Sequence, residues 1–312
     1  MSILSEPHFH NEKAAYAKLE SIVWPQGPVC PRCGGFDRIT KVNGKTARTG
    51  LWRCGPCKRQ FTVTVGTVFE RSHVKLHLWF QAAHLMASSK KGISAHQLHR
   101  TLRVTYRTAW FMEHRLREAM RDGALVPLGG KNKVIEADET FVGGKAKNRA
   151  FAPPPKKSVV FALVEREGRV HSQHVANVTA ATLGKAIEKI ADRQSHLMTD
   201  EARAYTGIGK GFAGHSTVIH SKDEYVRLGG FVHTNTIENY FSILKRGVIG
   251  TYHHVSEAHL PRYLAEFDFR YNHRAKLGIG DEARAEIALS GIVGKRLLYR
   301  DSCEPVTLSS TR

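Results

Sequence analysis

Three carboxylates and one lysine occupy positions from which they can share a site. Asp138 lies in the middle of the apolar run VIEADETF, which is typical of a buried strand. An acid in such a strand costs free energy unless it is paired or bound to a metal ion. Asp200 ends a second apolar run, HLMTD, and open α/β sheets bind ligands at the C-terminal ends of their strands. Glu238 and Lys245 are seven residues apart in a predicted helix, so they lie on one side of it.

This arrangement suits the transfer of a phosphodiester group. Such a reaction needs an activated nucleophilic oxygen and a stabilised leaving 3′ oxygen, and two Mg²⁺ ions about 3.5–4 Å apart provide both. Mg²⁺, or Mn²⁺ in its place, prefers carboxylate oxygens. We predict that Asp138 bridges the two ions and that Asp200 and Glu238 each complete the shell of one. Lys245 would position a DNA phosphate as a point charge.

Five further acids compete for these roles: Glu136, Glu139, Glu201, Asp223 and Glu224. On a strand, Glu136 shares a face with Asp138, whereas Glu139 faces the other way. The last two acids rival Glu238 for the third position, but they lie in a loop-like stretch. Ordinary solvated acids are the alternative interpretation for the whole set.

Four cysteines form two knuckles, Cys30-Pro-Arg-Cys33 and, after twenty residues, Cys54-Gly-Pro-Cys57. Two CxxC pairs at this spacing predict a tetrahedral Cys₄ zinc site. The zinc would be structural rather than catalytic, because four thiolates leave no position for a water molecule. A redox CxxC pair would leave the second knuckle unexplained.

The surroundings of the knuckles give three further expectations. The alternation in Phe61-Thr-Val-Thr-Val65 predicts a half-buried strand. The fifth cysteine, Cys303, is expected to be inert. Four basic residues beside the knuckles would either contact DNA phosphates or form a solvated basic face: Arg32, Arg53, Lys58 and Arg59.

Residues 72–122 have a helical pattern. The run Leu76–Ala87 predicts one helix, and Ser94 begins a second with a capping box to Gln97. Thr105 begins a third, whose apolar face is formed by Ala109, Met112, Leu116 and Met120. The arrangement resembles a helix-turn-helix, although plain helical packing is an alternative. The third helix would read the major groove, with candidate contacts at Arg107, Arg115 and Arg117.

The carboxylates must be positioned by the elements that follow the linker GALVPLGGKNK at 123–133. The strand that carries Asp138 is followed by extended segments at 158–165 and 169–176, so three strands are joined by hairpins. A helix from Thr179 to Ile190 leads to the strand 196–200. A short strand at 216–220 precedes the helix at 234–246, whose face of Ile237, Phe241 and Leu244 is apolar.

The bulk composition favours a nucleic-acid partner. The chain has 312 residues, and 47 Lys and Arg against 28 Asp and Glu give a formal charge of +19. No apolar run reaches the length of about 20 residues that a membrane span needs, and the N-terminus lacks the pattern of a signal peptide. We therefore expect a cytoplasmic protein without membrane partners, and a bacterial, nucleoid-associated one.

Four long motifs resemble the transposases of insertion-sequence family fifteen-ninety-five, whose catalytic module is also called the ISXO-type transposase domain. They are EADETFVGGK, LMTDEARAY, HTNTIENYFSILKRGVIGTYHHVS and HLPRYLAEFDFRYNHR. The resemblance extends from the cysteine knuckles to about residue 275. It implies a ribonuclease-H-like DDE core with Asp138, Asp200 and Glu238 as the acids and Lys245 as the base. Some relatives have Asn at the third acid, so Asn235 is the fallback.

Two segments after the third acid are rich in His, Arg and aromatic residues. Gly250–His254 and Phe269–Arg274 are candidates to line a DNA channel. We expect DNA contacts from Arg270 and Arg274, and a buried helical stripe from Tyr263, Phe267 and Tyr271.

The sequence thus predicts an α+β multidomain protein. Its parts would be a lead-in and zinc ribbon at 1–71, a helical DNA-binding region at 72–125, the catalytic core at 130–275 and a tail at 276–312. The expected activity is metal-dependent cleavage at insertion-sequence ends, followed by attack of the freed 3′-OH on target DNA. Joining two terminal inverted repeats calls for a dimer or larger assembly. The alternatives are a zinc-ribbon DNA-binding regulator and a nuclease that does not join strands.

Overall fold

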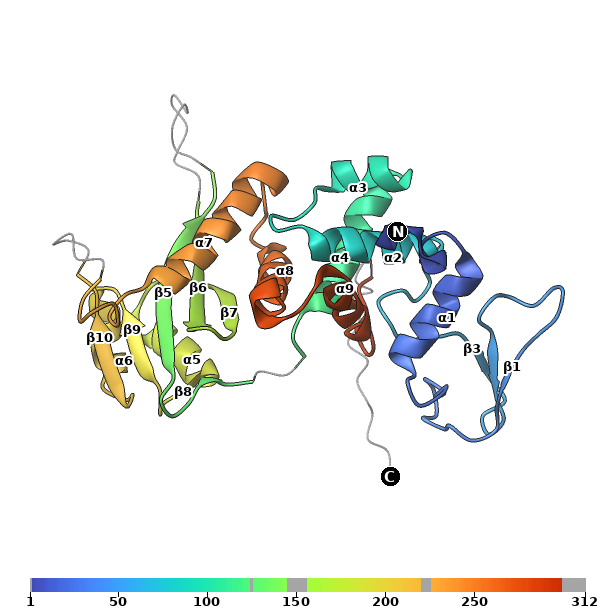
Figure 1. The fold of residues 1–312 in the computed structure, drawn as a ribbon, viewed down its shortest axis with the longest axis horizontal. Helices are drawn as coiled ribbons and strands as arrows, with labels where there is room; N and C mark the ends of the chain where they lie inside the picture. The colour runs from blue at the N-terminus through green and yellow to red at the C-terminus, as the bar shows by residue number, and fades with distance from the viewer. Residues whose placement is uncertain (1, 124–125, 145–155, 220–225, 299–312) are drawn as a thin grey trace.

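The computed structural model describes residues 2–123, 126–144, 156–219 and 226–298. The protein is α+β and elongated, with a small cysteine-bearing ribbon at one end, a helical body in the middle and a mixed sheet at the other end (Figure 1). No helix within these ranges has the length and apolar character that crossing a membrane requires.

The ribbon is a three-stranded antiparallel sheet of β1 (Ile39–Lys41), β2 (Trp52–Cys54) and β3 (Gln60–Phe61). Its small core joins Cys30, Cys54 and Phe61. The predicted strand Phe61–Val65 is wrong beyond Phe61, because Val63 is buried in the core of the helical body instead. The chain turns between the two cores, and a hydrogen bond of 2.7 Å between the hydroxyls of Thr62 and Thr64 stabilises the turn.

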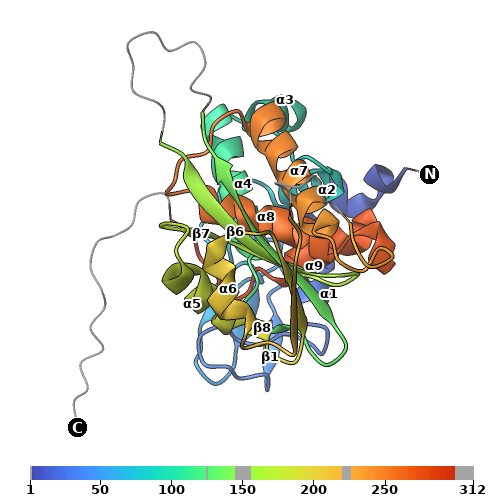
Figure 2. The same ribbon diagram turned by 90° about the vertical axis from the view of Figure 1, so that its left-hand side faces the viewer.

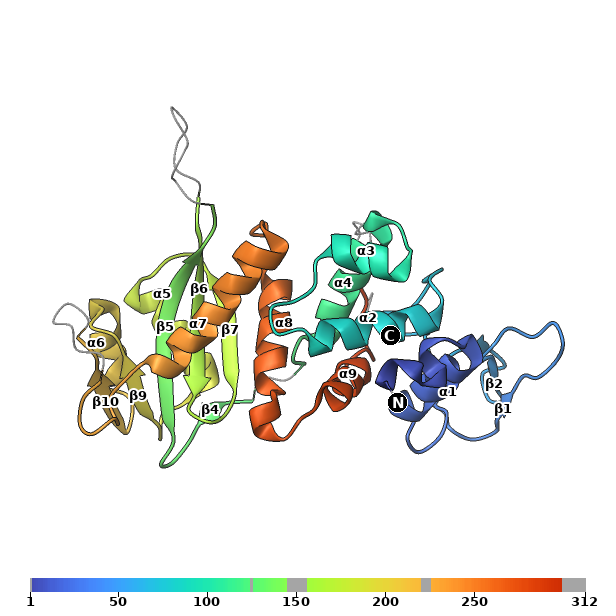
Figure 3. The same cartoon turned by 45° about the horizontal axis from the view of Figure 1, so that its top comes forward.

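The helical body is built around one apolar core shared by helices from both ends of the chain. Its helices are α1 (Glu12–Val23), α2 (Leu76–Ser88), α3 (Ala95–Leu102), α4 (Tyr106–Met120) and α9 (Asp281–Ser290). The expected helix starts are confirmed, because Ser94 accepts a hydrogen bond from the N–H of Gln97 and Thr105 from that of Thr108. Helix α9 packs against α2, so part of the stretch 276–312 belongs to this core (Figure 3).

The mixed sheet has five strands in the order β10-β9-β5-β6-β7. They are β5 (Val134–Val142), β6 (Ser158–Glu165), β7 (Val170–Val175), β9 (His196–Thr199) and β10 (Gly214–Thr217). The first three form an antiparallel meander, as predicted, whereas β9 pairs in parallel with both β5 and β10. The last strand begins two residues earlier than the predicted 216, and the expected end at His220 lies outside the described residues.

Two pairs of helices cover the faces of this sheet (Figure 2). Helices α5 (Ala180–Ile190) and α6 (Arg203–Gly209) pack on the face formed by Ile135, Ala137 and Leu163. Helices α7 (Asn235–Gly247) and α8 (Leu260–Asn272) pack on the face formed by Ala162 and Val164. Asp138 pairs with Ala162 in the register, so its side chain lies on the α7 face of the central strand.

The expected linker at 123–133 contains a short strand. Strand β4 (Leu128–Gly129) pairs in parallel with β8 (Ala191–Asp192), and Leu128 is buried in the core under α5. The turn residues Gly129 and Gly130 both have positive φ, which fits the Gly pair in the linker.

Helix α8 covers the edge strand β7 with side-chain hydrogen bonds. Asn272 accepts from the N–H of Val170 at 2.7 Å and donates to its carbonyl at 3.0 Å, as a neighbouring strand would. Asp268 accepts from both the N–H and the hydroxyl of Ser172, and also from the hydroxyl of Tyr240 on α7. Burial raises the pKa of Asp268 to about 7, against the hydrogen bonds that lower it. The edge of the sheet is therefore closed by this helix rather than left to solvent.

We predict that Asn272→Ala lowers the free energy of unfolding by about 2 kcal/mol or more, because each buried backbone group left without a partner costs about 1–3 kcal/mol. Denaturant unfolding of the full chain measures the change. Asn239→Ala is the matched control, since Asn239 is also on a helix but exposed, and its effect should stay within about 0.5 kcal/mol. Equal losses for the two variants would contradict the edge-closing role of α8.

Candidate zinc site and catalytic pocket

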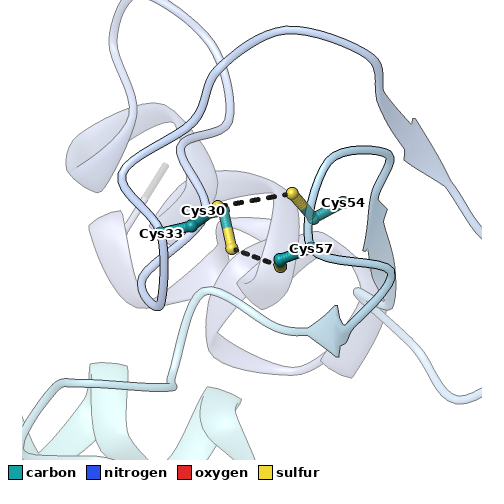
Figure 4. A group of neighbouring side chains, drawn as sticks. All are labelled: Cys30, Cys33, Cys54 and Cys57. Carbon is teal, nitrogen blue, oxygen red and sulfur yellow. Dashed lines mark hydrogen bonds between the residues drawn. The ribbon is translucent and has the colours of Figure 1, made fainter.

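The four knuckle cysteines converge in the ribbon (Figure 4). The Sγ atoms of Cys30 and Cys57 are 3.7 Å apart, those of Cys33 and Cys54 are 3.6 Å apart, and all four lie within 4.8 Å of one another. A tetrahedral zinc ion with Zn–S bonds of about 2.3 Å requires sulfur atoms about 3.8 Å apart. The cluster therefore fits a structural zinc ion.

A cavity of about 750 Å³ lies beside the central strand and the exposed side of α7. Three acids and three bases line it: Asp138, Glu139, Glu238, Lys91, Lys245 and Arg246. Glu238 and Lys245 come from the first and last turns of α7 and both face this cavity, which is the geometry expected from their spacing. Gly250 and Thr251, from the segment after α7, complete one wall.

Asp138 is the half-buried acid at the centre of the site. Its pKa is raised to about 7, first by burial and then by the negative charges of Asp200, Glu139 and Glu238, against a hydrogen bond from the N–H of Glu139. The side chains of Asp200 and Glu238 thus act on Asp138 from the end of β9 and from α7. A bound cation would favour the charged form of such a carboxyl group.

Asp200 lies beside the cavity rather than in its lining. Its Oδ1 accepts a hydrogen bond of 3.0 Å from the N–H of Ala202, at the turn into α6. In the described part of the chain, the four cysteine sulfur atoms lie within 4.8 Å of one another. The carboxylate oxygens of Asp138, Asp200 and Glu238 do not form such a group. Mutual repulsion of three negative charges favours this spread arrangement.

Glu238 is exposed in the first turn of α7, where its Oε1 accepts a hydrogen bond from the hydroxyl of Thr234 at 2.9 Å. The fallback residue Asn235 is also exposed, but it is outside the cavity lining. Of the two candidates for the third position, Glu238 is the one that faces Asp138.

Glu136, an alternative ligand from its position on the same face as Asp138, has other partners in the structure. It is fully buried, and its Oε1 accepts from Arg166 at 2.6 Å and from the hydroxyl of Thr236 at 2.9 Å. Its Oε2 accepts from the backbone N–H of Ile237 at 2.9 Å. Arg166 also donates to the carbonyls of Phe231 and His233. Glu136 therefore fastens the start of α7 to the central strand.

Glu139 faces the opposite side of the strand, as the alternation predicts. The hydroxyl of Tyr205, a fully buried residue of α6, donates a hydrogen bond to it. The pKa of Glu139 is raised by burial and by the charge of Asp200, while the bond from Tyr205 lowers it. Glu201 is exposed, and Asp223 and Glu224 lie outside the described residues, as does Cys303.

Several expected DNA contacts are wrong. Arg117 is fully buried and pairs with Glu113 at 3.0 Å and Glu266 at 2.7 Å. Arg270 is buried and pairs with the same Glu266. Burial lowers the pKa of Arg117, but the negative charges of Glu266 and Glu113 outweigh it and raise that pKa. Arg115 is also buried and donates to the carbonyl of Glu70. Helix α4 packs between α2 and α8, so its later turns cannot reach a DNA groove.

Other basic candidates stay predictions. Arg107, in the first turn of α4, is exposed, as are the four basic residues beside the knuckles. Arg274 is half-buried and donates to the carbonyls of Gly168 and Tyr271. The stripe of Tyr263 and Phe267 is buried as predicted, and Tyr271 packs against the same core from a half-buried position.

Comparison with known proteins identifies the family. Residues 127–272 match the ISXO2-like transposase domain, and residues 10–60 match the transposase zinc-ribbon domain. A protein described as an uncharacterized protein in transposable element ISH50, from Halobacterium salinarum, is 30% identical over 281 residues, which are 84% of this chain and 91% of that protein. The chain belongs to the IS1595 family of transposases.

The boundaries of the IS1595-family matches follow the elements described above. The transposase domain begins next to β4 and ends at Asn272, the last residue of α8, so it contains the pocket except for Lys91. The zinc-ribbon match contains α1 and all four cysteines. The relative is archaeal, so the bacterial, nucleoid-associated setting expected from the sequence has no support from this comparison.

We predict that Arg166→Ala lowers the free energy of unfolding by about 3–5 kcal/mol, because it leaves the buried carboxylate of Glu136 without its charged partner. Arg169→Ala is the control, because Arg169 pairs with Asp122 at the surface, where such pairs contribute about 0–1 kcal/mol. Denaturant unfolding compares the variants, and a similar small loss for both would show that Glu136 needs no partner.

A second prediction concerns the cysteines. Cys54→Ser removes one of the four sulfur atoms, so the purified protein should hold much less zinc and residues 26–69 should be cleaved faster by protease. Cys303→Ser, outside the cluster, should keep the full zinc content. Metal analysis and limited proteolysis test this, and unchanged zinc in the Cys54 variant would exclude the cluster as the zinc site.

Proposed function

We propose that this protein cleaves DNA at the ends of its insertion sequence and joins the freed 3′-OH to target DNA. The observation that carries the proposal is the cavity shared by Asp138, Glu238 and Lys245, with Asp200 acting on Asp138 from the adjacent strand. Apart from Lys91, the lining of the cavity lies in the part of the chain that matches a DDE transposase domain.

The strand order supports a ribonuclease-H-like catalytic core. A three-stranded antiparallel meander is followed by two strands that run parallel to its first strand, on the side away from the second. This order puts Asp138 on the central strand and Asp200 at the end of its parallel neighbour. We also propose the domain division at 1–71, 72–125, 130–275 and 276–312, in which α1 and α9 pack on the helical body.

Asp138, Asp200 and Glu238 would hold two divalent cations, Mg²⁺ or Mn²⁺. The donor set is suitable because all three groups are carboxylates, and nearby positive charge would favour the charged form of half-buried Asp138, whose pKa is raised to about 7. When bound, such ions activate the attacking oxygen and stabilise the leaving oxygen.

The chain's own residues have separate tasks in this proposal. Lys245, seven residues after Glu238 on the same side of α7, would hold the phosphate against the acids as a point charge. Glu136 and Arg166 would fix α7 so that Glu238 stays opposite Asp138. Water attacks first and the freed 3′-OH attacks second, and one site serves both because each step is a displacement at phosphorus.

DNA binding would involve the rest of the chain. The net charge of +19 favours a polyanionic partner. The exposed bases on the ribbon and Arg107 at the start of α4 are candidates to contact the terminal inverted repeats. Joining both ends of one element requires two active sites in one complex, so we propose a homodimer or larger assembly.

The prediction that tests this function uses Asp138→Ala and Asp200→Ala. Each should lower cleavage and strand transfer more than about 100-fold, because even groups that only orient metal ligands cost about 10–100-fold when removed. Binding to the element-end duplex should survive. Glu201→Ala is the control and should keep wild-type rates, since Glu201 is exposed and outside the pocket.

The products separate the candidate functions. Joined DNA from the wild-type chain supports a transposase, cleaved but unjoined DNA supports a nuclease, and binding without cleavage supports a regulator. Wild-type joining by either Asp variant in Mg²⁺ would show that the proposed site is wrong.

A further inference from the structure

Lys91 lines the catalytic pocket although it belongs to the helical body. It lies in the loop between α2 and α3, more than 40 residues before the pocket's central strand. This loop runs from the helical body toward the C-terminal end of α7 (Figure 1). Every other residue of the lining comes from the segment between β5 and Thr251.

Close backbone packing holds the loop against α7. A Cβ atom at Gly247, the last residue of α7, would lie 2.7 Å from the carbonyl oxygen of Lys91 and 2.4 Å from the ring of Phe267. A Cβ atom at Gly92, whose φ is +90°, would lie 1.8 Å from the hydroxyl of Tyr252. Both positions therefore require glycine if the loop is to approach this closely.

Further hydrogen bonds fix the two sides of this contact. The hydroxyl of Ser89 donates to the carbonyl of Gly92 at 2.7 Å within the loop. The hydroxyl of Tyr252 donates to buried Glu266 at 2.8 Å. Packing and hydrogen bonds thus hold the backbone around Lys91, while the side chain of Lys91 is exposed.

The cavity lining holds both basic and acidic side chains. Lys91, Lys245 and Arg246 line one cavity together with Asp138 and Glu238, and Glu139 borders it from the other side of the strand. Lys91 and Lys245 are both exposed and both line the cavity, so an anion that enters it can reach their charges. With cations on the acids, the whole lining would attract a phosphate backbone.

We propose that Lys91 binds a DNA phosphate next to the one that reacts, and that it couples the helical body to the catalytic pocket. The proposal rests on the proposed function, because it names a substrate contact in that site. Because Lys91 belongs to the helical body, its phosphate contact would align DNA bound by that body with Asp138 in the pocket. The close packing at Gly92 and Gly247 would keep Lys91 at a fixed position relative to α7.

The experiment is a double-mutant cycle that removes a charge from the protein, from the DNA, or from both, and compares the binding affinities. The probe is a duplex with the sequence of the element end, which is read from the DNA beside the gene. In each modified duplex, one phosphate near the cleavage position is replaced by an uncharged methylphosphonate. Binding is measured for the full-length wild type, Lys91→Ala, Lys91→Arg and Lys90→Ala. Ca²⁺ serves as the divalent ion because it also takes oxygen ligands, so the result does not depend on catalysis.

We expect Lys91→Ala to weaken binding about fivefold and to reduce the salt slope by about 0.9, which is the loss of one phosphate contact. One methylphosphonate position should weaken the wild type by a similar factor and have no effect on Lys91→Ala. Lys91→Arg should again bind more weakly when that phosphate is replaced by the methylphosphonate, because it keeps the positive charge. Lys90→Ala, an exposed neighbour outside the pocket, should behave as the wild type at that position.

Equal sensitivity of Lys91→Ala and Lys90→Ala at every phosphate would overturn the proposal, even if the wild type cleaves and joins DNA. Conversely, a phosphate contact at Lys91 in a chain that never joins DNA would support this contact and reject the transposase function. Failure of the wild type to bind the duplex at low salt would reject both.

Discussion

The buried pair of Glu136 and Arg166 fixes the geometry of the pocket. Glu136 uses both carboxylate oxygens, one for Arg166 and Thr236 and the other for the first turn of α7. A buried carboxylate requires a charged partner and hydrogen bonds to offset the loss of hydration. Because Glu136 is two residues before Asp138 on the same face of β5, the pair sets the distance between the central acid and the helix that carries Glu238 and Lys245.

A second set of buried polar groups extends this frame away from the pocket. Tyr240 of α7 and Asp268 of α8 meet Ser172 of the edge strand, so one hydrogen-bonded group joins two helices to the sheet. Beyond it, Glu266 pairs with Arg117 of α4 and Arg270 of α8. The charged groups between the helical body and the sheet are thus largely neutralised by one another, which ties the two parts of the chain together.

Local signals in the sequence predicted the elements well. Hydroxyl caps at Ser94, Thr105 and Thr179 mark helix starts because the hydrogen bond spans three residues. The strand after Phe61 was mispredicted because Val63 leaves the ribbon for another core, which no local pattern reveals. Alternation along β5 separated Glu136 from Glu139, but their partners Arg166 and Tyr205 are distant in sequence and come from tertiary packing.

The same limit applies to the basic residues. Arg115, Arg117 and Arg270 have the composition expected of a DNA surface, yet their surroundings bury them. Lys91 gave no chemical signal in the sequence, because its place in the pocket depends on packing of its loop against Gly247 and Tyr252, more than 150 residues later. Motifs identified the acids of the pocket, whereas long-range packing decided which bases join them.

The position of α9 has a consequence for how the chain is made. Ala288 and Leu289 of α9, with Ile292 just after the helix, complete the core around α2, and α9 also contacts α1 and α4. The ribosome therefore synthesises most of the helical body long before the helix that closes its core. A nascent chain that has not yet passed Ile292 exposes the apolar side of α2, so this body reaches its final packing only after the sheet and its pocket have been translated.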